Sequence, residues 1–526
     1  MRHNIQVNLS IKIIVIIAIF LFCSFSFLKP LPKPTKQDDS GIKLIIPTFL
    51  GNEERNYYGN KAPESLDIIW KTTLGCGKTI FPSKELDIRV MCGAGWTGQA
   101  LLIEDQGELF LIQGAYDYNL RKIKAKTGEV VWKYPYDDVI KSTGCVWVNP
   151  NKANDDPDKI VIFQGSRRGY DVSIHEKYNF SYRAISFRTG KELWRYNSVY
   201  GGSFSRDVDG TALIVDDTIF LGLETGDFVK LNPNPDSAQI IDSYKQPIEF
   251  FKQALYTKED VQAHRRNVVI ESAPALLDNF VFITSGAGYL YKYNKNSGQI
   301  DIQFKTGSDL DGSPIITREK KVLISIEKEY IPGKGGAMLI DPTKHKDSCV
   351  IWFYPTGDKH FVSWQGGIIG SCAINDKYIS ENDNSLAAFV GIDGYLYVVE
   401  NEFTNPFDLV KGPCNKALYS QPQEIFKYET GPSISTPIFT EDRLIVLTYE
   451  GLYMFAYDKN CNFSLLEKNT NIRGEATPII HYGRLFVASR DGNLYCLGKL
   501  IKNWELRINV SNTTLLFEGF CNIIKC

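Results

Sequence analysis

One short phrase recurs eight times along the chain, and it constrains the fold more than any other feature. Each copy is a short apolar run that follows a small residue or a turn, as in GQALLIE, SAPALLD and STPIFTE. Two of the separations between successive copies are only 40 and 41 residues, the usual length of a four-stranded propeller blade, and the longer ones fit a blade with an insertion. The runs open at Ala100, Val146, Ala212, Pro274, Pro314, Cys372, Pro437 and Pro478.

Residues 271–304 show one complete unit. Apolar and aromatic runs at 274–277, 280–284 and 289–293 and a last run ending at Phe304 are separated by turn residues. Four short strands joined by tight turns form an antiparallel meander. One such sheet is marginal alone, but eight arranged radially bury each other's faces. We therefore predict an all-β, eight-bladed β-propeller of four-stranded antiparallel blades over residues 63–498.

The strand around Trp70 is predicted to close the ring. It resembles the fourth strands around Trp132 and Trp194, whereas the last unit, residues 477–497, has three strands and no clear fourth. Pairing the N-terminal strand with this last blade would remove the one pair of open edges.

The two ends of the chain lie outside the repeat. Residues 11–28 are almost wholly apolar, which predicts an N-terminal hydrophobic helix that is either a cleaved signal peptide or an uncleaved membrane anchor. Residues 29–62 are polar and proline-containing, as in a flexible tether, and residues 499–526 form a C-terminal tail. We expect an extracytoplasmic protein, whether secreted, lumenal or periplasmic, anchored to the membrane through residues 11–28.

Cysteines and glycosylation sequons agree with that compartment. Ten cysteines follow the apolar run, and an even number suggests disulfides whose pairing the sequence leaves open. The formal net charge of −2 gives no support for a nucleic-acid surface. The sequons are at Asn179, Asn462, Asn509 and Asn512.

Acidic residues are predicted to gather at the axis. The first strand of a propeller blade lines the central channel, so residues three positions before each opening should ring its mouth. Facing carboxylates about 10 Å apart repel by roughly 1–2 kcal/mol at a dielectric of about 20. The repulsion would be offset by Arg206 or Arg473, by a calcium ion or by a basic partner; alternatively, the acids only accept hydrogen bonds from turn amides. The ring positions are Thr97, Thr143, Asp209, Glu271, Asp311, Ile369, Ile434 and Glu475.

Trp364 precedes the sixth opening and is also placed near the mouth. It would either stack on a planar ligand or form a hydrophobic plug, and we favour the plug. The predicted axial ligand-binding residues are Asp209, Glu271, Asp311, Glu475, Trp364 and Arg206, with calcium at Glu271 and Asp311. No residue is assigned a catalytic role from its own pattern.

The segments AKTGEVVW at residues 125–132 and RTGKELW at 188–194 resemble the tryptophan-docking motif of the pyrroloquinoline-quinone (PQQ)-like propeller repeats of quinoprotein dehydrogenases. That resemblance implies the eight-bladed fold. The family also includes non-enzymatic assembly factors, and the adjacent cysteine pair of its alcohol-oxidising branch is missing here.

The resemblance leaves two functions open. We predict a binding or scaffold module that takes a protein partner or small ligand at the propeller mouth. The alternative is a PQQ- and calcium-dependent dehydrogenase of alcohols or sugars, with Asp311 or Glu271 as the general base.

Overall fold

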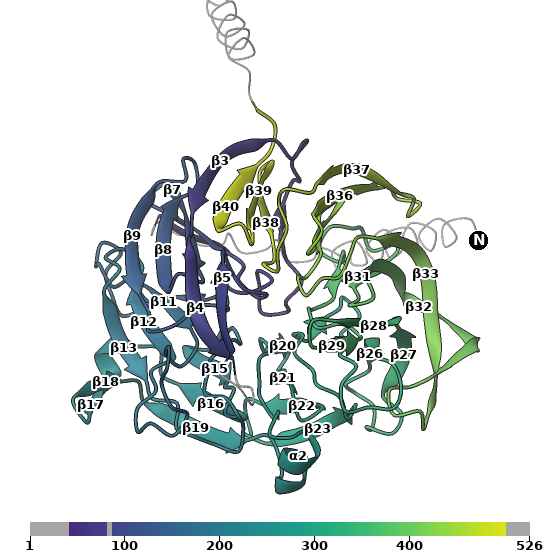
Figure 1. Ribbon diagram of the computed structural model, residues 1–526, viewed down its shortest axis with the longest axis horizontal. Coiled ribbons are helices and arrows are strands. Elements are labelled where there is room, and N and C mark those ends of the chain that lie inside the picture. Colours follow the sequence, from purple (N-terminus) through teal and green to yellow (C-terminus); the bar gives the residue numbers. More distant parts are fainter. Residues whose placement is uncertain (1–40, 82–86, 501–526) are drawn as a thin grey trace, which may run out of the picture. The chain divides into compact units, whose positions relative to one another are not determined.

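The apolar runs of the repeat form the strands of eight antiparallel sheets (Figure 1). The computed structural model describes residues 41–81 and 87–500. Each predicted opening lies at the start of the first strand of a blade, so both the number of blades and their phase are confirmed. The predicted N-terminal helix, tether residues up to 40 and tail residues from 501 lie outside the described part of the chain.

The first four blades contain sixteen strands. Blade one has β6 (Leu101–Asp105), β7 (Glu108–Gly114), β8 (Asn119–Lys124) and β9 (Val130–Pro135), and β1 (Ile42–Ile46) adds to its inner edge. Blade two has β10 (Cys145–Val148), β11 (Ile160–Gly165), β12 (Tyr182–Ser186) and β13 (Glu192–Tyr196). Blade three has β14 (Leu213–Val215), β15 (Thr218–Gly222), β16 (Asp227–Leu231) and β19 (Glu249–Ala254). Blade four has β20 (Ala275–Leu277), β21 (Phe280–Ser285), β22 (Tyr289–Asn294) and β23 (Ile300–Lys305).

The remaining blades follow the same plan. Blade five has β24 (Ile315–Ile316), β25 (Val322–Ile326), β26 (Gly336–Ile340) and β27 (Val350–Pro355). Blade six has β30 (Ala373–Ile374), β31 (Leu386–Val390), β32 (Tyr395–Lys411) and β33 (Leu418–Glu429). Blade seven has β34 (Ile438–Phe439), β35 (Arg443–Leu447), β36 (Leu452–Tyr457) and β37 (Phe463–Asn469). Blade eight has β38 (Ile479–His481), β39 (Arg484–Ala488), β40 (Asn493–Leu497) and β3 (Ile68–Thr73), with β2 (Gly59–Asn60) at its inner edge.

The predicted closure of the ring is confirmed. Strand β3 pairs antiparallel with β40, and Trp70 lies opposite Cys496. Trp70 then crosses to blade one, where its indole N–H donates to the carbonyl oxygen of Ala125 at 3.2 Å. Trp132 makes the same contact from blade one to Phe187 of blade two at 3.0 Å. Trp70 and Trp132 therefore connect neighbouring blades, whereas the buried indole N–H of Trp194 has no hydrogen-bond partner among the described residues.

Two insertions in the repeat form regular structure. Blade three carries an added hairpin, β17 (Gln239–Ile241) with β18 (Tyr244–Gln246), and its fourth strand is β19, which pairs with β16. The 3₁₀ turn η1 (Pro235–Ser237) precedes this hairpin, and the short helix α2 (Lys258–Ala263) follows β19 along the chain. Residues 401–424 extend β32 and β33 beyond the blade as one long hairpin. Within the described ranges, no helix is long and apolar enough to cross a membrane.

A segment before β3 runs across the inner strands of several blades, so this part of the predicted tether of residues 29–62 belongs to the propeller instead. Residues 47–58 hydrogen-bond to inner strands of several blades: the backbone N–H groups of Val146, Leu276 and Ile316 donate to Pro47, Glu53 and Glu54. Arg55 is fully buried there and donates to the carbonyl oxygen of Pro274 at 2.9 Å. Because these contacts fall at and after the openings, the residues three positions before the openings lie at the other end of the first strands.

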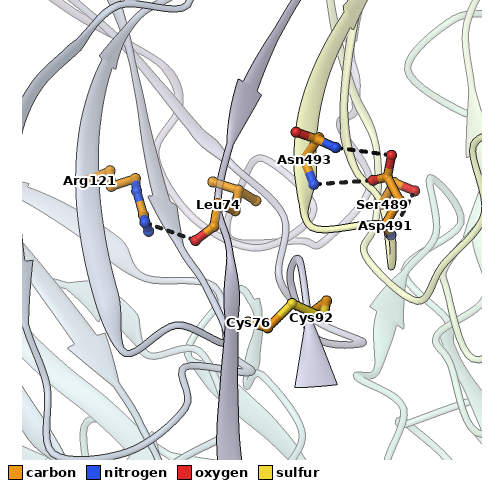
Figure 2. The surroundings of a disulfide bond; sticks show 7 residues. All are labelled: Leu74, Cys76, Cys92, Arg121, Ser489, Asp491 and Asn493. Carbon is orange, nitrogen blue, oxygen red and sulfur yellow. Dashed lines mark hydrogen bonds between the residues drawn. A yellow bond between two sulfur atoms is a disulfide. The ribbon is translucent and has the colours of Figure 1, made fainter. Parts of the chain in front are cut away.

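A disulfide-linked hairpin lies where the closing strand leads into blade one (Figure 2). Strands β4 (Cys76–Phe81) and β5 (Asp87–Cys92) pair antiparallel, and Cys76 is bonded to Cys92. Arg121 donates to the carbonyl oxygen of Leu74 at 2.9 Å, and Asp491 caps the turn before β40 by accepting from Asn493. One predicted disulfide is thus present, while Cys521 and Cys526 lie outside the described residues.

Candidate functional site

Two groups of three carboxylates lie in blades three to five. Their residues come just before the first strand or just after the second strand of a blade. In each group, one oxygen from every side chain lies within 4.8 Å of the others. The antiparallel meander explains the grouping, because the residue before the first strand and the residue after the second strand reach the same end of a blade. The first triad is Asp209, Glu224 and Glu271, and the second triad is Asp309, Glu327 and Glu329.

The first triad has an internal counter-charge. The Lys141 ammonium forms an ion pair with Asp209. Burial alone would lower the pKa of Lys141, but the charges of Asp209, Glu271 and Glu224 raise it above the usual value. Burial raises the pKa of Glu271 to about 7, with Lys141 opposing the rise and Asp209 adding to it. Lys141 therefore stays charged and balances only part of the triad.

The neighbouring Asp207 is fully compensated. Arg167 Nε donates to its Oδ2 at 2.7 Å, and both side chains are buried. Burial would raise the pKa of Asp207, but Arg167 and then Lys141 outweigh burial and lower it. Because each charge has its partner, this ion pair stabilises the structure beside the first triad and needs no ligand.

The second triad has much less compensation. Asn267 Nδ2 donates to Asp309 Oδ2 at 2.5 Å. Burial and then Asp309 raise the pKa of Glu327 far above its usual value, and burial, Asp309 and Glu271 do the same for Asp311. Burial raises the pKa of Asp309, and the neighbouring Asp311 and Asn267 oppose the rise. The second triad and Asp311 thus hold more acid than the surrounding groups can balance as anions.

Several carboxylate oxygens lack hydrogen-bond donors. Asp209, Glu224 and Asp309 are 0%, 2% and 4% exposed. Their Oδ1, Oε1 and Oδ1 atoms have no hydrogen-bond partner among the described residues. A buried ionised carboxylate without donors is strongly disfavoured unless it takes up a proton or a cation. The arrangement suits a hard cation such as calcium, which takes several oxygen ligands, or the ammonium of an organic ligand.

The structure brings together only part of the predicted site. Asp209, Glu271 and Asp311 lie among the carboxylates at the axis, as the phase of the repeat predicted. Glu475 is occupied separately: it accepts from Tyr116 at 2.9 Å and Tyr449 at 2.8 Å and pairs with Arg490.

Arg206 and Trp364 have local contacts instead. The Arg206 guanidinium donates to the carbonyl oxygens of Ser198, Ile174 and Glu176, so it fixes the blade-two insertion and does not balance the axial acids. Trp364, in the small hairpin of β28 (Asp358–Phe361) and β29 (Trp364–Gly366), stacks on Phe361 with ring centroids 6.3 Å apart. These two rings pack on an apolar cluster, which favours the plug interpretation; the cluster is Trp96, Ile369, Ile392 and Ile434.

Sequence reasoning missed half of the site. Lys141, Glu224, Glu327, Glu329 and Asn267 were not predicted. One usable signal existed: Glu224 and Glu327 each follow the second strand of a blade by one or two residues.

The two sequons within the described residues differ in access. Asn179 is 3% exposed, and its Nδ2 donates to the carbonyl oxygen of Arg206 at 3.2 Å. Asn462 is exposed. Asn509 and Asn512 lie outside the described residues. Glycosylation stays a prediction, and Asn462 is the better acceptor of the first two.

The fold has known counterparts, although the sequence does not. No protein-family model matches the chain, and no curated protein is similar to it in sequence. The quinohemoprotein alcohol dehydrogenase of Comamonas testosteroni superposes with a TM-score of 0.51 at 12% identity, covering 87% of this chain and 81% of that one. A europium-containing methanol dehydrogenase gives 0.52 at 12% identity, over 86% and 90%. In fold, the chain is similar to quinoprotein alcohol dehydrogenases.

A weaker likeness is to BamB from Moraxella catarrhalis, with a TM-score of 0.44 at 11% identity over 83% of this chain and 95% of that one.

The carboxylates at the axis fit a cation better than they fit pyrroloquinoline quinone. Pyrroloquinoline quinone carries carboxylates of its own, which require positive partners. The two cations beside the first triad, Lys141 and Arg167, are already paired with Asp209 and Asp207. Trp364 is stacked on Phe361, and the chain has no adjacent cysteine pair. The axial acids would therefore repel this quinone unless a cation were bound between them.

Proposed function

We propose that this protein is an extracytoplasmic binding module whose propeller axis takes a cation, either a hard metal ion such as calcium or a cationic group of a partner. The observation that carries the proposal is the set of buried carboxylate oxygens without donors at Asp209, Glu224 and Asp309. The Cys76–Cys92 disulfide supports an oxidising compartment. Anchoring through residues 11–28 stays a prediction, because they lie outside the described residues.

Calcium titration calorimetry and terbium luminescence on the purified protein test the proposal. We expect saturable binding that Glu271→Gln and Glu327→Gln each weaken at least tenfold, because each removes a charged ligand oxygen. Glu319→Gln, a change at an exposed acid, is the matched control and should bind like the wild type. Absence of saturable cation binding at millimolar concentration, or equal binding by all variants, would contradict the proposal.

A dehydrogenase is the second candidate, and the place of Glu271 among the carboxylates of the first triad favours it. A carboxyl group with a pKa of about 7, as at Glu271, is suited to general-base catalysis near neutral pH. The decisive assay adds PQQ and calcium and follows dye reduction over alcohols and sugars. Turnover that disappears in Glu271→Gln or Asp311→Asn would establish the enzyme, whereas calcium binding without quinone binding or turnover leaves the binding module.

A further inference from the structure

A separate cavity of about 450 Å³ lies between blades five and six, and none of the residues of the two carboxylate triads lines it. It is bounded by the end of β27, the start of the β28–β29 hairpin, the start of β32 and the end of β33. Its volume is in the range of small-molecule sites. Three lysines line it, Lys334, Lys359 and Lys427, together with Tyr354, Tyr395 and Tyr397.

The acids that line this cavity are already occupied. Asp393 accepts from the backbone N–H of Gly357 at 2.6 Å, from the hydroxyl of Tyr397 at 2.5 Å and from the N–H of Tyr395 at 3.2 Å. Asp358 forms an ion pair with Lys328, which comes from outside the lining. Neither carboxylate is therefore left to balance the lysines of the cavity.

The lysines themselves have no acidic partner among the described residues. Lys427 Nζ lies over the rings of Tyr395 and Tyr397, 4.6 and 4.9 Å from their centroids. Lys359 Nζ donates only to a backbone carbonyl oxygen, that of Asp393, at 3.4 Å. The cavity thus offers several ammonium donors and no carboxylate free of a partner among the described residues, which is the reverse of the axial site.

We propose that this lysine-lined cavity binds a small organic anion that carries several phosphate or carboxylate oxygens. Lysine ammonium groups act as compact point charges and make short, strong hydrogen bonds to such oxygens. The tyrosine rings hold Lys427 over the cavity and provide an apolar wall for the body of the ligand. This site is independent of the axial proposal, since its ligand has the opposite charge.

Titration calorimetry with inorganic pyrophosphate and with citrate tests the proposal on the full chain, in calcium-free buffer because both probes chelate calcium. We expect saturable binding of at least one probe, weakened as ionic strength rises. Preference for pyrophosphate would identify phosphate as the recognised group, and preference for citrate would identify carboxylate. The double variant Lys359→Gln/Lys427→Gln should bind at least tenfold more weakly, and Lys427→Arg should bind within a few-fold of the wild type.

Blade seven offers a matched control. Lys468 lies over the Tyr453 ring at 4.7 Å, in the same arrangement as Lys427 over its tyrosines, but it does not line the cavity. Lys468→Gln should therefore leave anion binding unchanged. The proposal is overturned if neither probe binds at millimolar concentration, or if the double variant and Lys468→Gln bind equally well. A thermal unfolding scan of each variant separates lost binding from lost folding.

Discussion

Buried charged side chains are handled in two different ways in this propeller. Arg55 has several acceptors: it donates to the carbonyl oxygens of Pro274 and Phe49 and to the hydroxyl of Thr48. The axial carboxylates have too few donors, as at Glu224 and Asp309. A satisfied buried charge contributes to a unique structure, whereas an unsatisfied one costs stability unless a proton or a ligand neutralises it. The difference marks the axis as a place for binding.

Asp341, after β26, shows the stabilising case and gives a pH prediction. Burial would raise its pKa, but hydrogen bonds from Thr343 and Lys321, at 2.6 and 2.9 Å, lower it to about 2. A depressed pKa stabilises the fold above the unfolded value of about 4, and this contribution is lost as the pH falls through 2. Asp341→Asn should therefore lower the free energy of unfolding by about 1–2 kcal/mol at pH 7.

Urea unfolding at pH 7 and near pH 2 measures that difference, which should shrink at the lower pH. Asp347→Asn is the control, because Asp347 is 80% exposed on the same turn. A deficit in Asp341→Asn that does not change with pH would show that the carboxylate charge is not its source.

For single residues, the sequence predicted only those axial acids that occupy the same position in their copies of the repeat. Asp209, Glu271 and Asp311 share one phase relative to the strand openings, so aligning the copies was enough. Lys141 could not be found in this way, because its reach to Asp209 depends on the curvature between blades two and three. Arg206 was misplaced because the path of its insertion, which supplies the carbonyl acceptors of Ile174 and Glu176, has no counterpart in the repeat.

The turn between the third and fourth strands recurs and contains a glycine in several blades. In blade two, this glycine packs against a tryptophan of the preceding blade. Gly190 has φ +70°, and a Cβ added there would lie 2.8 Å from the Trp132 ring. Gly298 occupies the same turn of blade four with φ +75°, but the nearest atom to its Cβ would be the Tyr293 hydroxyl, 3.9 Å away. Gly190 is needed for its positive φ and because a side chain there would collide with the Trp132 ring. Gly298 is needed for its positive φ alone.

Comparison of these two glycines separates the two costs. Gly298→Ala should destabilise the protein by about 1 kcal/mol, the usual penalty of a left-handed alanine. Gly190→Ala should cost about 1–3 kcal/mol more, because the tryptophan must shift from its site. Thermal and denaturant unfolding check both values. Equal destabilisation by the two substitutions would mean that docking of Trp132 contributes little.

Elements that belong to the repeat were predictable, and elements added to it were not. The first strands β20 and β34 begin one residue after Pro274 and Pro437, because apolar periodicity and turn residues agree there. The added hairpin of β17 and β18 has the same alternating pattern as a blade strand, so its sequence alone does not separate it from the blade. Only pairing with β16 identifies β19 as the true fourth strand, and pairing is not local in sequence.

At the scale of the whole molecule, the segment before blade one holds the ring in two ways. Residues 47–58 tie the inner strands together, and β3 then joins the last blade. Chain segments more than 400 residues apart in sequence thereby share one sheet, as in the pairing of Lys71 with Tyr495. Closure leaves no open pair of blade edges. A ring held at one junction should unfold as a unit and should be most sensitive at that junction.

Two lysines at equivalent positions of the repeat test this inference. Lys71 follows Trp70 in the closing strand β3, and Lys133 follows Trp132 in β9. Proline at either position disturbs the strand ladder, and we expect Lys133→Pro to cost at least about 2 kcal/mol. Lys71→Pro should cost more and broaden the unfolding transition, because freeing β3 also releases the segment that ties the inner strands. Calorimetry decides the matter: if both variants unfold in one equally sharp transition at the same temperature, the junction between first and last blades is no weaker than any other.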